Sequence, residues 1–269
     1  MLTGKFEKIV LIFAVMFCTF SLSAQNDAFN AYSPYSMYGI GDLSKFGNAY
    51  NRSMGGVGIA TRDKRNINIL NPASVTERDI QSFMLDFSIM EGNRYYAQKD
   101  AHSSNNTFNI NSITMSFPIY KPLAMYVGIA PFSDIGYKVS AWETDQNIIA
   151  RTGSILNTVK GYGGLYNLYA GAGINLFKGF SVGGEIDYVF GELHKDNSFE
   201  MASSSYRSIS SGYTLNLNAL TGKFGVQYAF PVAKEVTAVI GATYKLGTNV
   251  RGTVERFEIQ TISSINDST

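Results

Sequence analysis

Apolar and polar residues alternate along most of this chain from residue 80 onward. A period of two is the pattern of a β-strand whose two faces meet different surroundings. It is clearest in residues 112–119, 123–130, 166–176, 180–190 and 236–246, and noisier in 81–97 and 213–230. The sequence therefore predicts an all-β protein with about seven antiparallel strands.

The connections between these predicted strands alternate in length. Residues 120–122, 178–179 and 231–235 are short, whereas 99–106, 145–160 and 196–211 are long and rich in Ser, Asn and Asp. Short turns at one end and long loops at the other are typical of an outer-membrane β-barrel. Aromatic residues near the short turns predict an interfacial girdle: Phe117, Tyr120, Phe177, Phe180, Tyr228 and Phe230.

One predicted strand breaks the pattern. Within residues 213–230 the apolar positions change phase between Leu217 and Leu220. A one-residue slip turns every following side chain to the other face, so we predict a β-bulge there.

The first 24 residues have the features of a secretory signal. Lys5 and Lys8 precede an apolar stretch over residues 9–20, and small residues lie before Gln25. We therefore divide the chain into a signal peptide (1–24), an N-terminal leader and hatch (25–79) and a partial transmembrane β-barrel (80–269). A soluble all-β sandwich or barrel is the alternative, but the signal, the long strands and the loop asymmetry favour the outer membrane.

The amino-acid composition excludes several classes of function. The 22 basic and 21 acidic residues nearly balance, which argues against nucleic acid as a partner. Charged residues make up only 16% and aromatic residues 13%, which fits a membrane barrel. The single cysteine, Cys18, lies in the signal, so the mature chain has no thiolate metal site or disulfide. We expect no metal and no cofactor.

The stretch from Asn48 to Ser74 fits neither a helix nor a strand well. Gly55, Gly56 and Gly58 permit positive φ and close backbone approach, and Asn71-Pro72 favours a turn. Its apolar residues are too dense for a freely solvated loop, so a compact plug competes with a surface loop. A charge run at residues 62–65 is expected to be a solvated tip, or else to meet acidic groups on a barrel wall.

The motifs in this stretch resemble those of a known family. Arg52-Ser53-Met54-Gly55-Gly56-Val57-Gly58-Ile59-Ala60, followed by Asn71-Pro72-Ala73-Ser74, is similar to the N-terminal hatch of the FadL/OmpP1/TodX outer-membrane transport proteins. The upstream residues 33–43 resemble the version found in Bacteroidota. The resemblance implies a transmembrane barrel that takes up hydrophobic small molecules, such as long-chain fatty acids, without an energy source.

The resemblance also implies site residues. It places the ligand path through the hatch at Arg52, Met54, Gly55, Gly56, Gly58, Asn71 and Pro72. In that family a kink in the third strand opens the wall sideways to outer-membrane lipid. Proline cannot donate to a strand ladder, so we assign the opening to Gly128, Pro131, Phe132 and Gly136; a bulge without functional consequence is the alternative.

The chain departs from that family in two ways. The family's barrels have about twice as many strands, and residues 257–269 end the chain on a polar segment. We therefore expect a truncated product with about half a barrel; a small barrel of about eight strands is the alternative.

No catalytic constellation is present. Glu185 and Asp187 share a strand face and are expected to line a wet lumen, opposite Lys245. His102 and His194 fall in predicted loops or strand tips, and no Gly-x-Ser-x-Gly elbow occurs, so we do not expect an enzyme. The alternative function is a non-transporting barrel that is a partner subunit of an outer-membrane secretion or assembly complex.

Overall fold

The computed structural model describes residues 31–77, 83–99, 101–203, 205–234 and 236–261. The predicted signal peptide and the last eight residues lie outside these ranges, as does the boundary assigned at residue 79.

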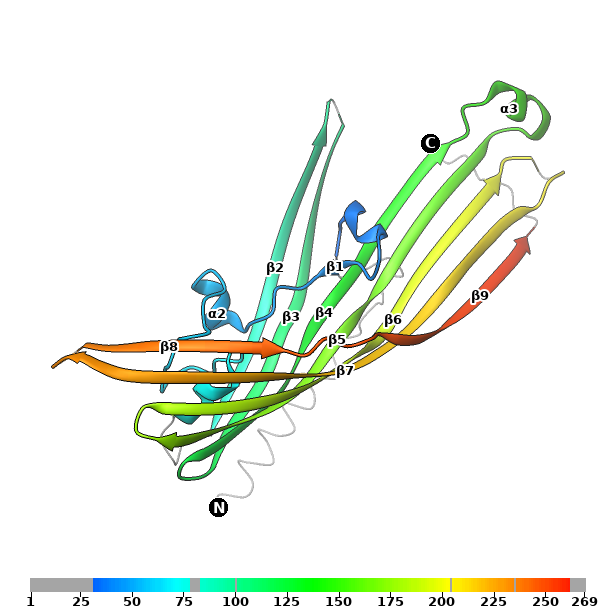
Figure 1. The fold of residues 1–269 in the computed structure, drawn as a ribbon. Coiled ribbons are helices and arrows are strands. Elements are labelled where there is room, and N and C mark those ends of the chain that lie inside the picture. Colours follow the sequence, from blue (N-terminus) through cyan, green and yellow to red (C-terminus); the bar gives the residue numbers. More distant parts are fainter. Residues whose placement is uncertain (1–30, 78–82, 100, 204, 235, 262–269) are drawn as a thin grey trace, which may run out of the picture.

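One curled antiparallel sheet forms most of the molecule (Figure 1). Its strands follow chain order from β2 to β8, and β9 pairs with the part of β7 that β8 leaves free. The strands are β2 (Met84–Gln98), β3 (Ala101–Tyr120), β4 (Leu123–Trp142), β5 (Ile155–Phe177), β6 (Phe180–Met201), β7 (Ser208–Ala233), β8 (Val236–Lys245) and β9 (Arg251–Thr261). The predicted all-β class and antiparallel pairing are confirmed. The described residues form a half-barrel and do not close into a barrel.

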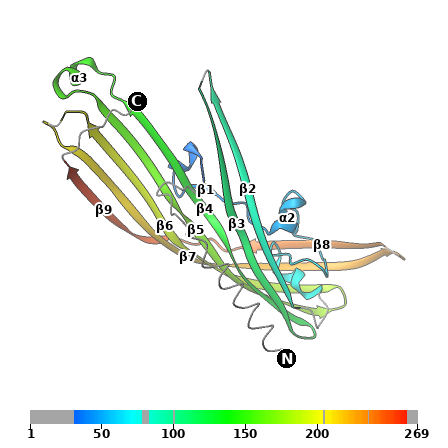
Figure 2. The same cartoon turned by 180° about the vertical axis from the view of Figure 1, so that it is seen from behind.

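The N-terminal segment, residues 31–77, lies on the concave side of this sheet, and we call it the hatch. It contains η1 (Pro34–Met37), β1 (Asp42–Leu43), α2 (Ala49–Ser53) and η2 (Pro72–Glu77). A last short helix, α3 (Gln146–Thr152), connects β4 to β5 at the long-loop end (Figure 2). Among the described residues, no helix combines the length and the apolarity needed to cross a bilayer.

The two faces of the sheet have opposite character. On β6 the buried concave positions near the short turns include Ser181, Glu185 and Asp187, whereas Ile186 on the convex face is 63% exposed. On β7, Lys223 and Gln227 are buried while Leu220 and Phe224 are exposed. This arrangement is the reverse of a soluble sandwich, because the apolar side chains point outward.

The strands extend further than the sequence predicted. The segment 99–106 was expected to be a long loop, but β3 already begins at Ala101. Likewise β6 continues to Met201 and β7 begins at Ser208, inside the predicted loop 196–211. Polar residues occupy both faces of the sheet at this end, so the period-two signal disappears although the backbone pairing continues.

The predicted bulge between Leu217 and Leu220 was wrong. β6 and β7 stay in register from Phe180–Tyr228 to Phe199–Ile209. The phase change has another cause: the concave face is polar near the short turns and becomes apolar further up, where Leu215 and Leu217 pack against a buried cluster. The change of the concave face from polar to apolar therefore produced the same sequence pattern as a bulge would.

Candidate functional site

Glycines of three neighbouring strands form the seat of the hatch. Gly173 of β5 pairs with Gly183 of β6, which pairs with Gly225 of β7, so the three lie in one row across the concave face. A Cβ at Gly183 would come 2.4 Å from Pro72 C, and one at Gly173 would come 2.6 Å from Pro72 O. We call this row the glycine track. The hatch backbone approaches so closely that a side chain on the track would displace it.

Asn71 fixes the hatch above the track. Its Nδ2 donates to Ile59 O at 2.7 Å and to Val226 O of the wall at 3.1 Å. Its Oδ1 accepts from Ala73 N at 3.0 Å, which starts η2. Gln227 Nε2 of β7 also donates to Ile59 O, at 2.8 Å. The buried side-chain amide of Asn71 therefore links Ile59 and the start of η2 to β7.

A second set of buried asparagines holds the hatch together internally. Asn48 caps α2 by accepting from Asn51 N at 3.1 Å, and Asn48 Nδ2 donates to Ile67 O at 2.6 Å. Asn51 Nδ2 donates to Asn68 Oδ1, and Asn68 Nδ2 donates to Gly58 O at 2.6 Å. Gly58 is required by packing, since a Cβ there would come 2.6 Å from Asn51 Nδ2.

Two ion pairs of the sheet face the hatch: one is buried, and in the other the lysine is partly exposed. Lys223 Nζ is 2.6 Å from Glu185 Oε1 and donates to Ile69 O of the hatch at 2.8 Å. Tyr126 OH donates to the other Glu185 oxygen. Beside them, Lys245 Nζ lies 3.2 Å from Asp187 Oδ2. The sequence identified Lys245 as a facing cation but missed Lys223, which lies in the noisier strand.

Phe46 of the hatch covers both lysines. Its ring centroid is 4.7 Å from Lys223 Nζ and 5.9 Å from Lys245 Nζ. The ring also meets Tyr169 edge-on at 5.8 Å. An aromatic face attracts an ammonium group, so Phe46 makes a cation–π contact with each lysine from the hatch side.

Arg62 ties the hatch to the short-turn end of the wall. Its guanidinium donates to Gly179 O in the β5–β6 turn at 3.1 Å, to Ser181 Oγ, and to Thr76 Oγ1 at 3.2 Å. Arg62 Nε also lies 3.4 Å from Glu77 Oε2, and the side chain is only 6% exposed.

The other residues of the charge run, 63–65, differ from Arg62 in their surroundings. Lys64 and Arg65 are exposed, as a solvated tip would be. Asp63 accepts from Arg65 N and from Asn66 Nδ2, both at 2.8 Å, and these hydrogen bonds hold the pKa of Asp63 below its usual value. The solvated-tip interpretation was therefore wrong for Arg62 alone.

The glycine-rich turn lies at the periphery of the hatch. Gly55 and Gly56 have φ of 73° and 87°, in open surroundings, and Met54 is exposed. Arg52 on α2 donates to Lys45 O and contacts Met90 Sδ of β2. Of the sequence-predicted hatch residues, the structure therefore brings Asn71 and Pro72 together at the seat, packs Gly58 inside the hatch, and leaves the others at its periphery.

The wall splits between β3 and β4. Their pairing runs only from Tyr120–Leu123 to Ile113–Ile129, and β4 then continues alone on that edge. A bulge between Pro131 and Ser133 shifts the register of β4 against β5 at this point. β1 fills part of the split by pairing Leu43 with Ser133 and Asp42 with Asp134.

The residues assigned to a lateral opening lie along this split. Phe132 O accepts from Ser44 N at 2.9 Å, and Gly136 O accepts from Ser33 N at 2.8 Å. Gly128 lies just below the split, where a Cβ would come 2.6 Å from the Tyr169 hydroxyl. In the structure this edge of β4 is therefore hydrogen-bonded to the hatch backbone.

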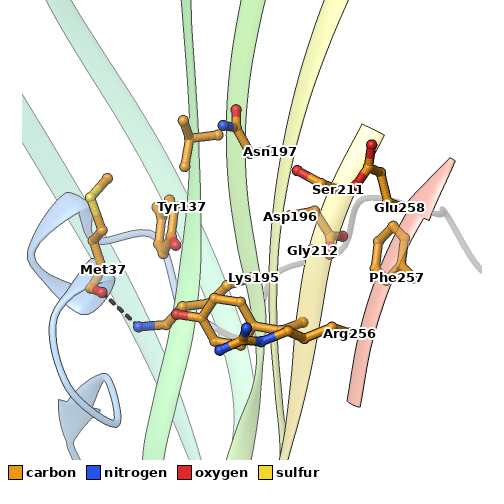
Figure 3. Close-up of a pocket in the computed structure, with 12 residues that line it drawn as sticks. Met37, Tyr137, Lys195, Asp196, Asn197, Ser211, Gly212, Arg256, Phe257 and Glu258 are labelled. Atoms are coloured by element: carbon orange, nitrogen blue, oxygen red, sulfur yellow. Dashed lines mark hydrogen bonds between the residues drawn. The ribbon is translucent and has the colours of Figure 1, made fainter. Parts of the chain in front are cut away.

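A cavity of about 580 Å³ opens at the long-loop end of the concave face (Figure 3). Lys195 Nζ of β6 donates to Met37 O at 2.8 Å, which anchors η1, and Arg256 of β9 extends across the cavity (Figure 3). Tyr137 forms another wall. Over the residues that the structure describes, no cluster of three metal-binding side chains occurs here or elsewhere.

A half-barrel with an outward apolar face and a hatch seated on its inner face defines the general class: a protein built on a curled antiparallel half-barrel. The family model for BamG matches residues 6–269, and the chain belongs to the BamG family. This family is associated with the outer-membrane β-barrel assembly (BAM) complex. Searches of the curated proteins and of the solved structures found no match.

The family assignment corrects the sequence analysis. Membership of the FadL/OmpP1/TodX family was wrong, and so was the function as a fatty-acid channel. The resemblance rested on Gly-Gly-x-Gly and Asn-Pro-Ala-Ser. In the structure Gly58 serves the internal packing of the hatch, and Asn71 and Pro72 serve the packing of the hatch on the sheet. That packing requirement carries no information about a transported ligand.

Proposed function

We propose that this chain is a membrane-embedded accessory subunit of the β-barrel assembly machinery. The observation that carries the proposal is its membership of the BamG family over residues 6–269. It favours the partner-subunit alternative over transport. The following features of the wall support a place in the membrane and a partner at the edges of the sheet.

The convex face carries an apolar band of membrane dimensions. On β6 every convex residue from Phe180 to Phe190 is apolar or aromatic, and Glu192 and His194 follow. At about 3.3 Å per residue this stretch is roughly 33 Å long, and a tilt of about 40° reduces its height to roughly 25 Å. That height matches the apolar band of an outer-membrane barrel.

Aromatic clusters lie at both ends of this band. Near the short turns Phe177 and Phe180 stack at 4.8 Å, and Phe180 meets Tyr228 at 6.3 Å. At the other end Tyr188 and Phe190 stack at 5.5 Å. Aromatic girdles mark the two water–membrane interfaces of such barrels, so the band between them is suited to the hydrocarbon layer.

The edges of the half-barrel are suited to partner strands. In the described part of the chain β2 pairs only with β3, and β8 and β9 pair only with β7. An unpaired backbone group in hydrocarbon costs several kcal/mol, so both edges need further strands when the wall is in a membrane. A barrel subunit of the assembly machinery can supply such strands.

Co-purification tests the proposal. An affinity tag is inserted in α3, where no residue is buried, and the full chain is expressed in its native bacterium. The expected result is enrichment of the central barrel subunit of the BAM complex from detergent-solubilised outer membranes. The control is an unrelated outer-membrane porin with the same tag at matched abundance. Enrichment no greater than that of the porin would overturn the proposal.

A further inference from the structure

An apolar groove runs along the convex face over β4 to β7. It consists of two adjoining hollows of about 730 and 430 Å³ that share Ala172, Gly184 and Phe224. Its floor is made of small residues, Ala170, Ala172, Gly184 and Gly222, and large apolar side chains such as Ile186 and Phe224 form its walls.

The register of the strands explains the groove. Ala172 pairs with Gly184, which pairs with Phe224, and Ala170 pairs with Ile186, which pairs with Gly222. Two glycines therefore lie diagonally between the large side chains of Ile186 and Phe224. The result is a channel in the band assigned above to the hydrocarbon layer.

The lower end of the groove lies beside two cationic turns. Leu123 and Ile174 pair with each other at this end, and Lys121 and Lys178 lie in the turns just below them. Both lysines are exposed, and neither turn contains an acidic residue. The aromatic pair Phe177–Phe180 marks the same level as an interface.

We propose that this groove binds an acyl chain of an anionic phospholipid, whose headgroup phosphate is held by Lys121 and Lys178. The inference rests on the membrane position in the proposed function and names a ligand on that surface. Apolar walls over small residues fit a hydrocarbon chain, and positive charge at the interfacial end fits a phosphate. A protein segment in the same groove is the competing occupant, which the experiment separates.

The groove can be filled without disturbing the backbone. A Cβ at Gly184 would meet only Phe224 atoms, at 3.9 and 4.0 Å, and one at Gly222 would meet its nearest atom at 3.4 Å. Valine suits a strand and would occupy the floor at both positions. The matched control is Ala242→Val, on the exposed convex face of β8 outside the groove.

The experiment uses the full chain, purified and placed in lipid nanodiscs that contain phosphatidylglycerol with a photoactivatable acyl chain. We expect cross-links on peptides of β5, β6 and β7 in the wild type and in Ala242→Val. In Gly184→Val/Gly222→Val they should fall several-fold. Undiminished labelling in the double variant would overturn the acyl-chain site.

The headgroup is tested with Lys121→Gln/Lys178→Gln. The wild type should label more strongly with phosphatidylglycerol than with zwitterionic phosphatidylcholine carrying the same acyl probe. The lysine variant should lose this preference and keep its acyl cross-links. Equal labelling by both lipids in the wild type would refute the charge assignment.

Co-purification of the BAM barrel subunit is measured for every variant in the native bacterium. Normal co-purification together with undiminished lipid labelling of the groove variant would mean that the inference fails and the proposed function stands, whereas loss of co-purification in the wild type would mean that the proposed function fails. If the wild type cross-links a protein partner through the groove residues and no lipid, the occupant is a protein and the proposal is wrong.

Discussion

Asn71 lies directly over Gly225: a Cβ added to Gly225 would come within 2.0 Å of Asn71 Oδ1. The two residues are far apart in the chain, one in the hatch and one on β7. Their contact is where the hatch rests on the glycine track, and Asn71 also bonds to the wall at Val226 O. The hatch is therefore seated by backbone proximity as well as by side chains.

The first prediction tests this seat. Gly225→Val should push Asn71 off the wall and lower the free energy of unfolding by about 1–3 kcal/mol, the usual cost of overpacking. Urea unfolding in detergent micelles measures the change, and limited proteolysis should cut the hatch sooner. Gly184→Val, on the opposite face of β6 where space exists, is the control and should leave both nearly unchanged.

The second prediction concerns the buried ion pair. Lys223→Met leaves Glu185, whose side chain is fully buried, without its cation and removes the donor to Ile69 O. An uncompensated buried charge costs about 3–5 kcal/mol of unfolding free energy. Glu185→Gln/Lys223→Met should recover most of that loss in the same assay. Equal instability of the single and double variants would argue against an electrostatic cause.

The third prediction compares two arginines of one charge run. Arg62→Gln removes the charged hydrogen bonds to the β5–β6 turn, which should cost about 1.5–3 kcal/mol. Arg65→Gln changes the same charge at an exposed site and should have almost no effect. The measurement is hydrogen exchange of η2 amides, and similar exchange in both variants would contradict the structure.

The fourth prediction tests the split between β3 and β4. Leu43 and Ser133 are paired residues of antiparallel strands, close enough for a disulfide. In a Cys18→Ser background, Leu43→Cys/Ser133→Cys should cross-link on mild oxidation. Leu43→Cys/Ile135→Cys, displaced by two residues on β4, should cross-link poorly. The yield of each disulfide is read from gel mobility under non-reducing conditions. A higher yield for Leu43→Cys/Ile135→Cys than for Leu43→Cys/Ser133→Cys would contradict the pairing of β1 with β4.

The sequence by itself determined most of the strands, because a sheet between two different environments imposes a period of two on its strands; β9 was not predicted. It also identified Gly58, Asn71 and Pro72 as unusual, since their types are rarely chosen for a solvated loop. It could not assign their purpose, and motifs that serve hatch packing were taken for a transport family. The strand ends were missed where polar residues occupy both faces.

Only the tertiary structure decided what these residues meet. The glycine track depends on the mutual register of β5, β6 and β7, and Lys223 reaches Glu185 only because β6 and β7 pair at that position. Arg62 lies in a run that looks solvated, yet it is buried because the chain folds back onto the β5–β6 turn. Contacts between residues so distant in the chain leave no local pattern, since each strand constrains its own faces and not its neighbour's register.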